Sequence, residues 1–354
     1  MTRILFRCDG NETTGLGHVS RCVGLAEAAA ELGATPVFVG HFGTQARMLL
    51  SEAKIAVAPL DPRTGTADDA GVVSAFAAAV QASRVVVDGY AFGEGYLQRL
   101  ALAPRAAPLF IVDDAAALRS YPAGSCILSP SARGESLHYS GEDLTILRGP
   151  HYLLLRRSLR TLRRARPLGT RLLVAVGAAD PSGGTMRLVR ALAALGPHVP
   201  VDVVLRGDAP GRDALARAVT ALPQPTRVFG WLPHLAHRYA DAFGCITTGG
   251  LTKYEARYLG LPVATVCQSS LESLDTEQMG PGEVTDLTSI VYGPEAELER
   301  AISEFVHAAV AVTHDPPPES WGDDPTLLAA SVLVRGWPDF DFDHVHDAPT
   351  APPF

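Results

Sequence analysis

One histidine near the start of the chain has the surroundings of a catalytic base. In the stretch RCDGNETTGLGHVSR, residues 7–21, His18 follows Gly15 and Gly17 and lies between an apolar run and a helical pattern. The glycines allow a tight turn and the close approach of a ligand. Imidazole has an ordinary pKa of about 6.5, so His18 can accept a proton near neutral pH. The alternative is that His18 only caps the helix.

Asp88 and Tyr90, in VVVDGYAF, follow another apolar run, and Asp113 and Asp114 follow the next one. Ligands of an open parallel sheet bind at the carboxyl ends of its strands, where these residues would lie. Asp88 and Tyr90 can hold a sugar hydroxyl and orient a reacting group. The alternative is that Asp88 caps a turn and Tyr90 packs in the core.

A glycine-rich stretch in the second half, GGLTKYE, has the composition of a diphosphate-binding loop. Gly249, Gly250 and Thr252 lie between an apolar run and a helical pattern. Their backbone N–H groups can form a nest for a diphosphate. Glu255, one turn into the helix, can accept hydrogen bonds from two ribose hydroxyls. The same spacing makes Thr252 and Glu255 a capping box, and both roles can coexist.

Other stretches point less directly to a ligand. Gly230, near the end of the run 226–231, is assigned to substrate binding, and GAADPSGGT, residues 177–185, is either a second ligand loop or a plain turn. A solvated linker helix, rather than an anion site, is expected for the arginines at 156, 157, 160, 163, 164 and 166. The C-terminal tail contains His344, His346 and Asp347, but we expect it to be poorly ordered and not a metal site.

The elements that would position these residues alternate between strands and helices. Strands are expected at 3–9, 35–40, 84–90, 107–115, 171–177, 201–207, 226–231, 244–249 and 262–267. Helical patterns lie at 18–32, 72–82, 185–195, 213–222 and 252–259. Apolar strands joined by helices predict parallel sheets that are buried on both faces. The fold class is therefore α/β, with two Rossmann-like, doubly wound domains facing a cleft.

Four segments are expected along the chain. Residues 1–150 form the N-terminal Rossmann-like domain, 151–168 an Arg-rich linker and 169–324 the C-terminal, nucleotide-binding domain. Residues 325–354 hold a closing helix, which crosses back to the first domain, and the Pro- and Asp-rich tail.

The composition limits the classes of protein to which the chain can belong. The 354 residues are 47% hydrophobic and 19% charged, enough for two cores, and the net charge of −8 argues against nucleic-acid binding. Five scattered cysteines without a C-x-x-C pair indicate reduced thiols. A signal peptide and a membrane-spanning run are both missing, so we expect a cytoplasmic protein. No cofactor or metal is predicted, and the oligomeric state stays open.

Six stretches in chain order resemble the nucleotide-sugar hydrolase of pseudaminic acid biosynthesis and the related spore-coat polysaccharide proteins. They are RCDGNETTGLGHVSRCVGLA, VVVDGYAF, IVDDAA, LRGPHYLLLR, VAVGAADPSGGT and GGLTKYEARYLGLP. The resemblance extends over residues 3–280 and implies the GT-B architecture. In that architecture the C-terminal Rossmann-like domain holds the nucleotide and the N-terminal one faces the sugar.

The resemblance also implies an activity. The hydrolase family removes UDP from a diacetamido-trideoxy sugar by breaking the sugar C1–O bond, with inversion and without a metal. Its catalytic base corresponds to His18 and its active-site tyrosine to Tyr90. The GG-x-T-x-x-E segment is also similar to that of the peptidoglycan N-acetylglucosaminyl transferase, whose ribose-binding glutamate corresponds to Glu255.

This chain departs from the hydrolase family at several positions. SLES, residues 270–273, puts Ser270 and Leu271 where the family usually has Asn-Gln, and serine keeps only part of the hydrogen bonding of an amide. Ser129 and Pro130 stand where "LN" is usual, and Ala178 stands where a second glycine is common. These changes favour a different sugar or a different acceptor.

We predict a metal-independent, inverting nucleotide-sugar hydrolase, with a UDP-sugar as its substrate. His18 is the base, Tyr90 orients the sugar and Ser270 assists, while helix N-termini and backbone amides stabilise the leaving phosphate. Substrate binding is assigned to Gly15, Gly17, Asp88, Gly230, Gly249, Gly250, Thr252 and Glu255. The alternative is a GT-B glycosyltransferase in which His18 deprotonates an acceptor hydroxyl. A third hypothesis is a non-catalytic binder of nucleotide-sugars.

Overall fold

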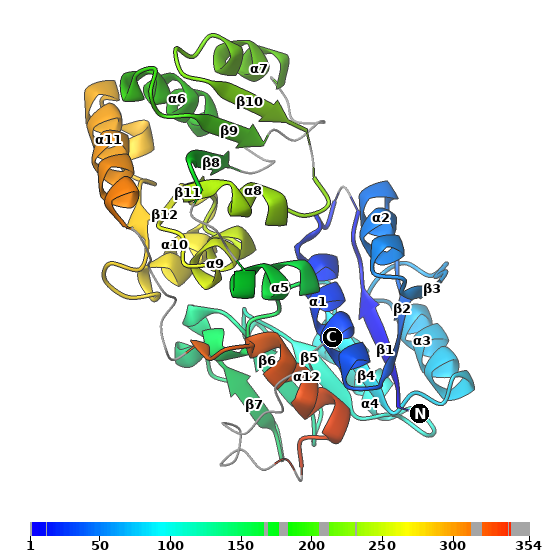
Figure 1. Ribbon diagram of the computed structural model, residues 1–354. Helices are drawn as coiled ribbons and strands as arrows, with labels where there is room; N and C mark the ends of the chain where they lie inside the picture. Colours follow the sequence, from blue (N-terminus) through cyan, green and yellow to red (C-terminus); the bar gives the residue numbers. More distant parts are fainter. Residues whose placement is uncertain are drawn as a thin grey trace. The chain divides into compact units, whose positions relative to one another are not determined.

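The computed structural model describes residues 2–11, 13–165, 169–176, 183–204, 212–230, 232–312, 321–338 and 340. The chain divides into two compact units, Met1–Arg157 with Ser320–Phe354, and Ser158–Glu319. Each unit contains one parallel sheet with helices on both of its faces (Figure 1). The two units are described separately below.

Unit 1 is built on a seven-stranded sheet in the order β3-β2-β1-β4-β5-β6-β7. Its strands are β1 (Arg3–Cys8), β2 (Thr35–Val39), β3 (Ala56–Ala58), β4 (Arg84–Asp88), β5 (Leu109–Val112), β6 (Cys126–Ser129) and β7 (Thr145–Arg148). All neighbouring strands pair in parallel, so the chain must cross from one end of the sheet to the other after each strand.

The strands of unit 1 are buried on both faces because helices cover each face. The helical segments are α1 (Gly17–Glu31), α2 (Thr44–Glu52), α3 (Ala67–Ala79), α4 (Glu94–Ala101), the 3-10 turns η1 (Ala132–Ser136) and η2 (Pro150–Tyr152), and α12 (Pro325–Arg335). Along β1, Ile4 and Phe6 pack in the core formed with α1, α2 and α12. Leu5 points to the opposite face and packs with α3 and α4. The helix near the C-terminus is therefore part of unit 1.

Unit 2 repeats this plan with a six-stranded sheet in the order β10-β9-β8-β11-β12-β13. Its strands are β8 (Arg171–Ala175), β9 (Val201–Val204), β10 (Thr226–Phe229), β11 (Ala242–Thr247), β12 (Val263–Thr265) and β13 (Thr285–Asp286). Its helical segments are α6 (Gly184–Ala191), η3 (Leu192–Leu195), α7 (Arg212–Thr220), α8 (Ala236–Ala240), α9 (Leu251–Tyr258), α10 (Ser270–Glu277), η4 (Ile290–Tyr292) and α11 (Glu295–Ala311). The predicted pair of doubly wound parallel sheets is confirmed.

The arginine-rich segment is less solvated than predicted. Helix α5 (Arg157–Ala165) begins at the end of unit 1. Arg156 and Arg160 are buried, with 8% and 6% of their surface exposed. The guanidinium of Arg163 lies over the ring of Tyr258, 4.5 Å from its centroid. Position 166 and the C-terminal tail with His344, His346 and Asp347 lie outside the described residues.

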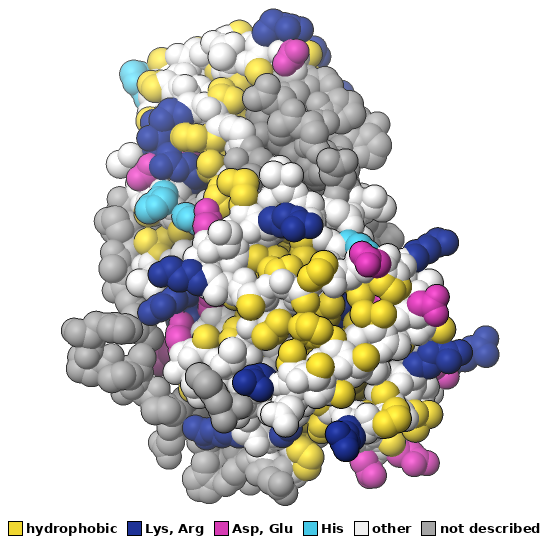
Figure 2. Space-filling view, turned by 90° about the vertical axis from the view of Figure 1, so that its right-hand side faces the viewer, with side chains coloured by type: hydrophobic (Ala, Val, Ile, Leu, Met, Phe, Trp, Pro, Cys, Tyr) yellow, Lys and Arg dark blue, Asp and Glu magenta, His cyan; other side chains and the backbone are white. Residues whose placement is uncertain are grey.

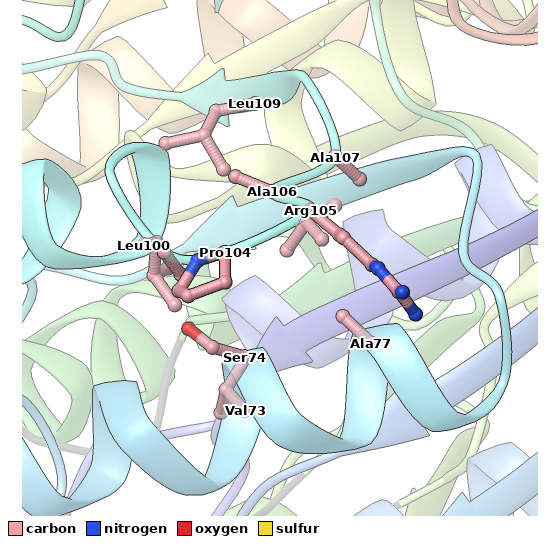
Figure 3. A pocket seen from close by; sticks show the side chains of 11 residues that line it. Val73, Ser74, Ala77, Leu100, Pro104, Arg105, Ala106, Ala107 and Leu109 are labelled. Carbon is pink, nitrogen blue, oxygen red and sulfur yellow. The ribbon is translucent and has the colours of Figure 1, made fainter.

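Two surface features of unit 1 lie away from the carboxyl ends of its strands. A small cavity of about 10 Å³, room for one water molecule, lies at the amino ends of β4 and β5, between Val85, Leu109 and the helices α3 and α4 (Figure 3). The side of unit 1 along the edge strand β3, where α2 and α3 flank the sheet, exposes apolar side chains among charged ones (Figure 2). Met48 and Val72 on these helices are 45% and 42% exposed.

Candidate functional site

In unit 1, the predicted base lies at the point where the strand order reverses. The chain leaves β1 toward β2 and later returns to β4 on the other side of β1, so β1 and β4 flank the topological switch point. Helix α1 begins at Gly17, and its N-cap residue, Leu16, makes no side-chain cap. His18 is therefore the second residue of the helix, and the alternative that it caps α1 is wrong.

The imidazole of His18 is held by the carboxylate that ends β4. Nδ1 of His18 lies 2.7 Å from Oδ1 of Asp88, which is completely buried. Arg21, one helical turn after His18, donates to both oxygens of Asp88, from Nη2 at 2.6 Å and from Nε at 2.7 Å. Both oxygens of Asp88 thus have partners within the protein, and Asp88 orients His18 instead of contacting a ligand directly.

A second carboxylate, at the end of β5, completes this charged cluster. Arg21 donates from Nη1 to Oδ2 of Asp114 at 2.7 Å, and the hydroxyl of Tyr90 donates to Oδ1 of Asp114 at 2.9 Å. Tyr90 is 68% exposed, so the alternative that it packs in the core is wrong. Its ring meets the ring of His18 edge-on, with the centroids 4.8 Å apart. The strand ends at β1, β4 and β5 therefore place His18, Asp88 and Tyr90 in one site.

The charges of this cluster fix the protonation of its carboxylates. Burial acts to raise the pKa of Asp88, but the charge of Arg21 and the neighbouring His18 outweigh it, and the pKa lies well below its usual range. Arg21 likewise lowers the pKa of Asp114 against the effect of burial. Burial raises the pKa of the Cys22 thiol, which therefore stays protonated and donates to Oδ2 of Asp88 at 3.4 Å.

This arrangement is suited to proton abstraction. Nδ1 of His18 lies 2.7 Å from the acceptor Asp88 and 3.2 Å from the donor Nη2 of Arg21. The shorter contact, with an ionised carboxylate that can only accept, favours the tautomer with the proton on Nδ1 and the lone pair on Nε2. Within the described residues, Nε2 has no hydrogen-bond partner. Asp88 and Asp114 against the one guanidinium of Arg21 give the charged groups around the imidazole a net negative charge.

The loop before His18 has the open conformation that a ligand needs. Asn11 accepts hydrogen bonds at its side-chain oxygen from the backbone N–H groups of Thr13 and Thr14, and at its carbonyl oxygen from Gly15 N–H at 2.9 Å. Gly15 has a φ of +72°. A Cβ atom at Gly15 or Gly17 would meet no heavy atom within 4 Å, so the space beside both glycines is open.

In unit 2, the predicted diphosphate loop follows β11 at the switch point between β8 and β11. Helix α9 begins at Leu251, and its N-cap residue, Gly250, has no side chain to offer. Thr252 and Glu255 therefore lie inside the helix, and the predicted capping box is not formed. A Cβ atom at Gly249 would lie 2.6 Å from Sγ of Cys267, so only glycine fits at this position. The loop 177–182 lies outside the described residues.

The remaining predicted residues of unit 2 differ in accessibility. Glu255 is 9% exposed and accepts a hydrogen bond at Oε2 from the hydroxyl of Tyr239 at 2.9 Å. Ser270 is exposed at the first position of α10, where Ser269 is the N-cap and accepts from Glu272 N–H. Gly230 is exposed after β10.

Lys253, which was not among the predicted residues, ties the glycine loop to α10. Its ammonium is completely buried and donates to the carbonyl of Gly249 at 2.6 Å, to Oδ2 of Asp275 at 2.8 Å and to Oγ1 of Thr276 at 3.0 Å. The hydroxyl of Tyr254 also donates to Asp275. All three protons of the ammonium are used, so Lys253 is a positioning residue for the loop.

Replacing Lys253 by methionine is expected to destabilise unit 2 by about 3–5 kcal/mol, since it removes the buried ammonium that pairs with Asp275. It also frees the Gly249 carbonyl, so UDP, the ligand that the sequence predicts for this loop, should bind more weakly. Chemical denaturation and titration calorimetry with UDP measure the two effects. Lys54→Met is the matched control because Lys54, the other lysine of the chain, is exposed. Equal stability of the two variants would refute the anchoring role.

Three residues of these sites were not predicted, although the position of each in the sequence gives an indication of its role. Arg21 lies three positions after His18, on the same face of a helix. Asp114 follows a predicted strand, but no role was assigned to it. Lys253 stands four positions after Gly249, the distance at which a helical side chain reaches back to the preceding turn.

In the described part of the chain, no group of three or more His, Cys, Asp or Glu residues could hold a metal ion. Among the same residues, no helix is long and apolar enough to cross a bilayer. All five cysteines are buried and free.

No protein-family model and no characterised protein sequence matches the chain. Solved structures do match along almost all of it. MnaA of S. aureus with UDP superposes with a TM-score of 0.65 at 10% identity, over 94% of this chain and 96% of that one. The UDP-GlcNAc 2-epimerase of Neisseria meningitidis, bound to UDP-GlcNAc, gives 0.62 at 11% identity, over 95% and 100%. The glycosyltransferase SnogD of Streptomyces nogalater gives 0.55 at 18% identity, over 95% and 100%.

These identities are low, so the likeness establishes the fold. Together with the two parallel sheets, it places the chain among proteins of the GT-B fold, as the sequence resemblance implied.

Proposed function

We propose that this protein is a glycosyltransferase of the GT-B fold, which transfers a sugar from a UDP-sugar to an acceptor hydroxyl with His18 as the general base. The observation that carries the proposal is the buried Asp88 on Nδ1 of His18, which leaves Nε2 with its lone pair and without a described partner. The position at a switch point, where open α/β sheets bind ligands, adds support.

The reaction is a single displacement at the anomeric carbon. Nε2 of His18 removes the proton of the acceptor hydroxyl while its oxygen forms a bond to C1 of the sugar. The bond between C1 and the diphosphate oxygen breaks, UDP leaves with the electron pair, and the configuration at C1 inverts. Asp88 stabilises the imidazolium until the proton passes to solvent. Tyr90, anchored on Asp114 and exposed beside His18, is placed to orient the sugar.

The donor nucleotide is assigned to unit 2. The backbone N–H groups of the first turn of α9, after Gly249 and Gly250, would hold the diphosphate with Thr252, and helix N-termini favour such an anion. Glu255 is the group we assign to the ribose and Gly230 borders the nucleotide. The choice of UDP is supported by fold neighbours that were solved with UDP and with UDP-GlcNAc.

The second candidate function is hydrolysis, in which a water molecule takes the place of the acceptor hydroxyl. It is favoured by the pairing of His18 with Tyr90, the two residues that the hydrolase resemblance singles out, whose rings are in contact. Transfer is preferred because the region that carries an Asn-Gln pair in the hydrolases here presents Ser270 and Leu271, both exposed. Fold neighbours named as glycosyltransferases support the same choice.

The test is to incubate the protein with UDP-, CDP-, GDP- and dTDP-sugars in ¹⁸O-water, with and without methyl α-D-glucoside as a model acceptor. Mass spectrometry follows the nucleotide and the sugar. A glycoside formed with release of UDP supports transfer, whereas free sugar carrying ¹⁸O at C1 identifies a hydrolase. Binding of UDP-sugars without any release of UDP would refute both and favour the non-catalytic binder.

A further inference from the structure

Unit 1 contains a second polar cluster at the carboxyl edge of its sheet, which the His18 site does not use. We call it the His41 cluster, and its members are Arg7, Asp9, His41, Thr64 and Asp69. Arg7 lies in β1 and Asp9 directly follows it, and His41 follows β2. Thr64 precedes α3, and Asp69 lies in its first turn. The cluster joins a buried ion pair to a half-exposed imidazole.

The buried part of the His41 cluster is a guanidinium that lies between two carboxylates. Arg7 is completely buried and donates from Nη1 to Oδ1 of Asp9 at 2.6 Å and from Nη2 to Oδ2 of Asp69 at 2.8 Å. Burial acts to raise the pKa of Asp9, but hydrogen bonding and the charge of Arg7 lower it below its usual range. Asp9 is therefore ionised and acts as a hydrogen-bond acceptor.

Thr64 links the ionised Asp9 to His41 through two hydrogen bonds. The hydroxyl of Thr64 donates its single proton to Oδ2 of Asp9 at 2.7 Å. The oxygen of Thr64, 3.1 Å from Nδ1 of His41, can then only accept from that nitrogen. Nδ1 therefore carries the proton, and Nε2 has the lone pair. His41 is 33% exposed, and no described residue bonds to its Nε2.

The loop that carries His41 runs beside the loop that leads to His18. Gly10 N–H donates to the carbonyl of His41 at 3.0 Å, and Gly43 N–H donates to the carbonyl of Gly10 at 2.8 Å. Gly10 and Phe42 form a parallel bridge. Two imidazoles, each with its proton fixed on Nδ1, thus come from paired loops at one edge of one sheet.

We propose that His41 binds the acceptor by accepting, at Nε2, a hydrogen bond from a second hydroxyl group, so that the acceptor is a polyhydroxylated, sugar-like molecule. This inference rests on the proposed function, in which His18 takes the proton of the reacting hydroxyl. A monohydric alcohol would leave Nε2 of His41 unused.

Two substitutions separate this role from a structural one. His41→Asn places an amide N–H near the position of Nδ1, so it keeps the bond to Thr64 and loses the group at Nε2. His41→Gln places a polar atom near Nε2 and gives up the bond to Thr64. Binding of methyl α-D-glucoside is measured by saturation-transfer NMR, so the readout does not depend on turnover, and circular dichroism checks that each variant is folded.

We expect His41→Asn to weaken the binding of methyl α-D-glucoside by about 3- to 10-fold, the value of one hydrogen bond, while His41→Gln stays near wild type. Equal binding to His41→Asn and wild type, or loss in the Gln variant alone, would assign His41 to loop anchoring and overturn the inference. Failure of the wild type to bind the glycoside would overturn it too. If the glycoside binds through His41 but UDP is never released, the proposed function fails and the His41 site stands.

Discussion

Replacing His18 by alanine is expected to lower the turnover of the nucleotide-sugar by about 10²–10⁴-fold, the contribution of a positioned general base. Asp88 does not take the place of Nε2 in this variant, because its oxygens still accept hydrogen bonds from Arg21 and Cys22. The affinity for UDP should be unchanged, since the nucleotide is assigned to unit 2. Steady-state kinetics and titration calorimetry with UDP measure the two quantities.

A finer variant and a control accompany the alanine substitution. His18→Asn keeps an N–H group that can donate to Asp88 but has no atom at the position of Nε2. It should therefore be as inactive as His18→Ala while staying closer to wild type in stability. His307→Ala removes an exposed histidine of α11 in unit 2 and should leave turnover intact. Substantial activity in His18→Asn would show that another group is the base.

The fold was predictable because its long strands are continuous apolar runs in the sequence. Residues 3–9 contain the apolar run 4–6 and residues 84–90 contain the run 85–87, and they became β1 and β4. The strands β3, β6, β7 and β13 were missed because two to four residues give no period of their own, whereas the equally short β5 and β12 lie within the longer predicted runs 107–115 and 262–267. Their place in the sheet follows from the strands beside them and not from their own composition.

The candidate site was predictable only at the ends of those strands. His18 and Asp88 were singled out separately, because each follows an apolar run, but their contact depends on β1 and β4 being neighbours. The sequence does not contain that pairing. Arg21 was missed for the same reason, since its two carboxylate partners are 67 and 93 residues away.

The predicted capping box is not formed because helix α9 begins one residue before Thr252. The predicted pair, Thr252 with Glu255, has the correct spacing for a cap. The helix nevertheless begins at Leu251, with Gly250 in an extended conformation as the N-cap. Lys253 reaches back to the carbonyl of Gly249 and so fixes the loop from inside the helix. A buried lysine is rare enough that pattern rules assign this position to the surface.

Replacing Asp88 by asparagine is the second change with a large expected effect. It should lower turnover by about 10²–10⁴-fold without changing the affinity for UDP. An amide can turn its NH₂ group toward Nδ1 of His18, which then becomes the acceptor and moves the ring proton to Nε2. The imidazole would stay in place in the wrong tautomer. A wild-type rate for Asp88→Asn would mean that the carboxylate does not set the tautomer.

Asp88→Asn should also cost about 3–5 kcal/mol of unfolding free energy at neutral pH, because Arg21 loses its buried bidentate partner. The folded-state pKa of Asp88 lies below its unfolded value of about 3.9, so its contribution is complete above that pH and is lost as the pH falls through the folded value. The stability gap between wild type and variant should therefore be present at neutral pH and narrow below about pH 4. Asp202→Asn is the control, since Asp202 is a buried carboxylate between Arg171 and Arg227 in unit 2. It should lose stability with the same pH dependence and keep full turnover, which separates the loss of a buried ion pair from the loss of the base.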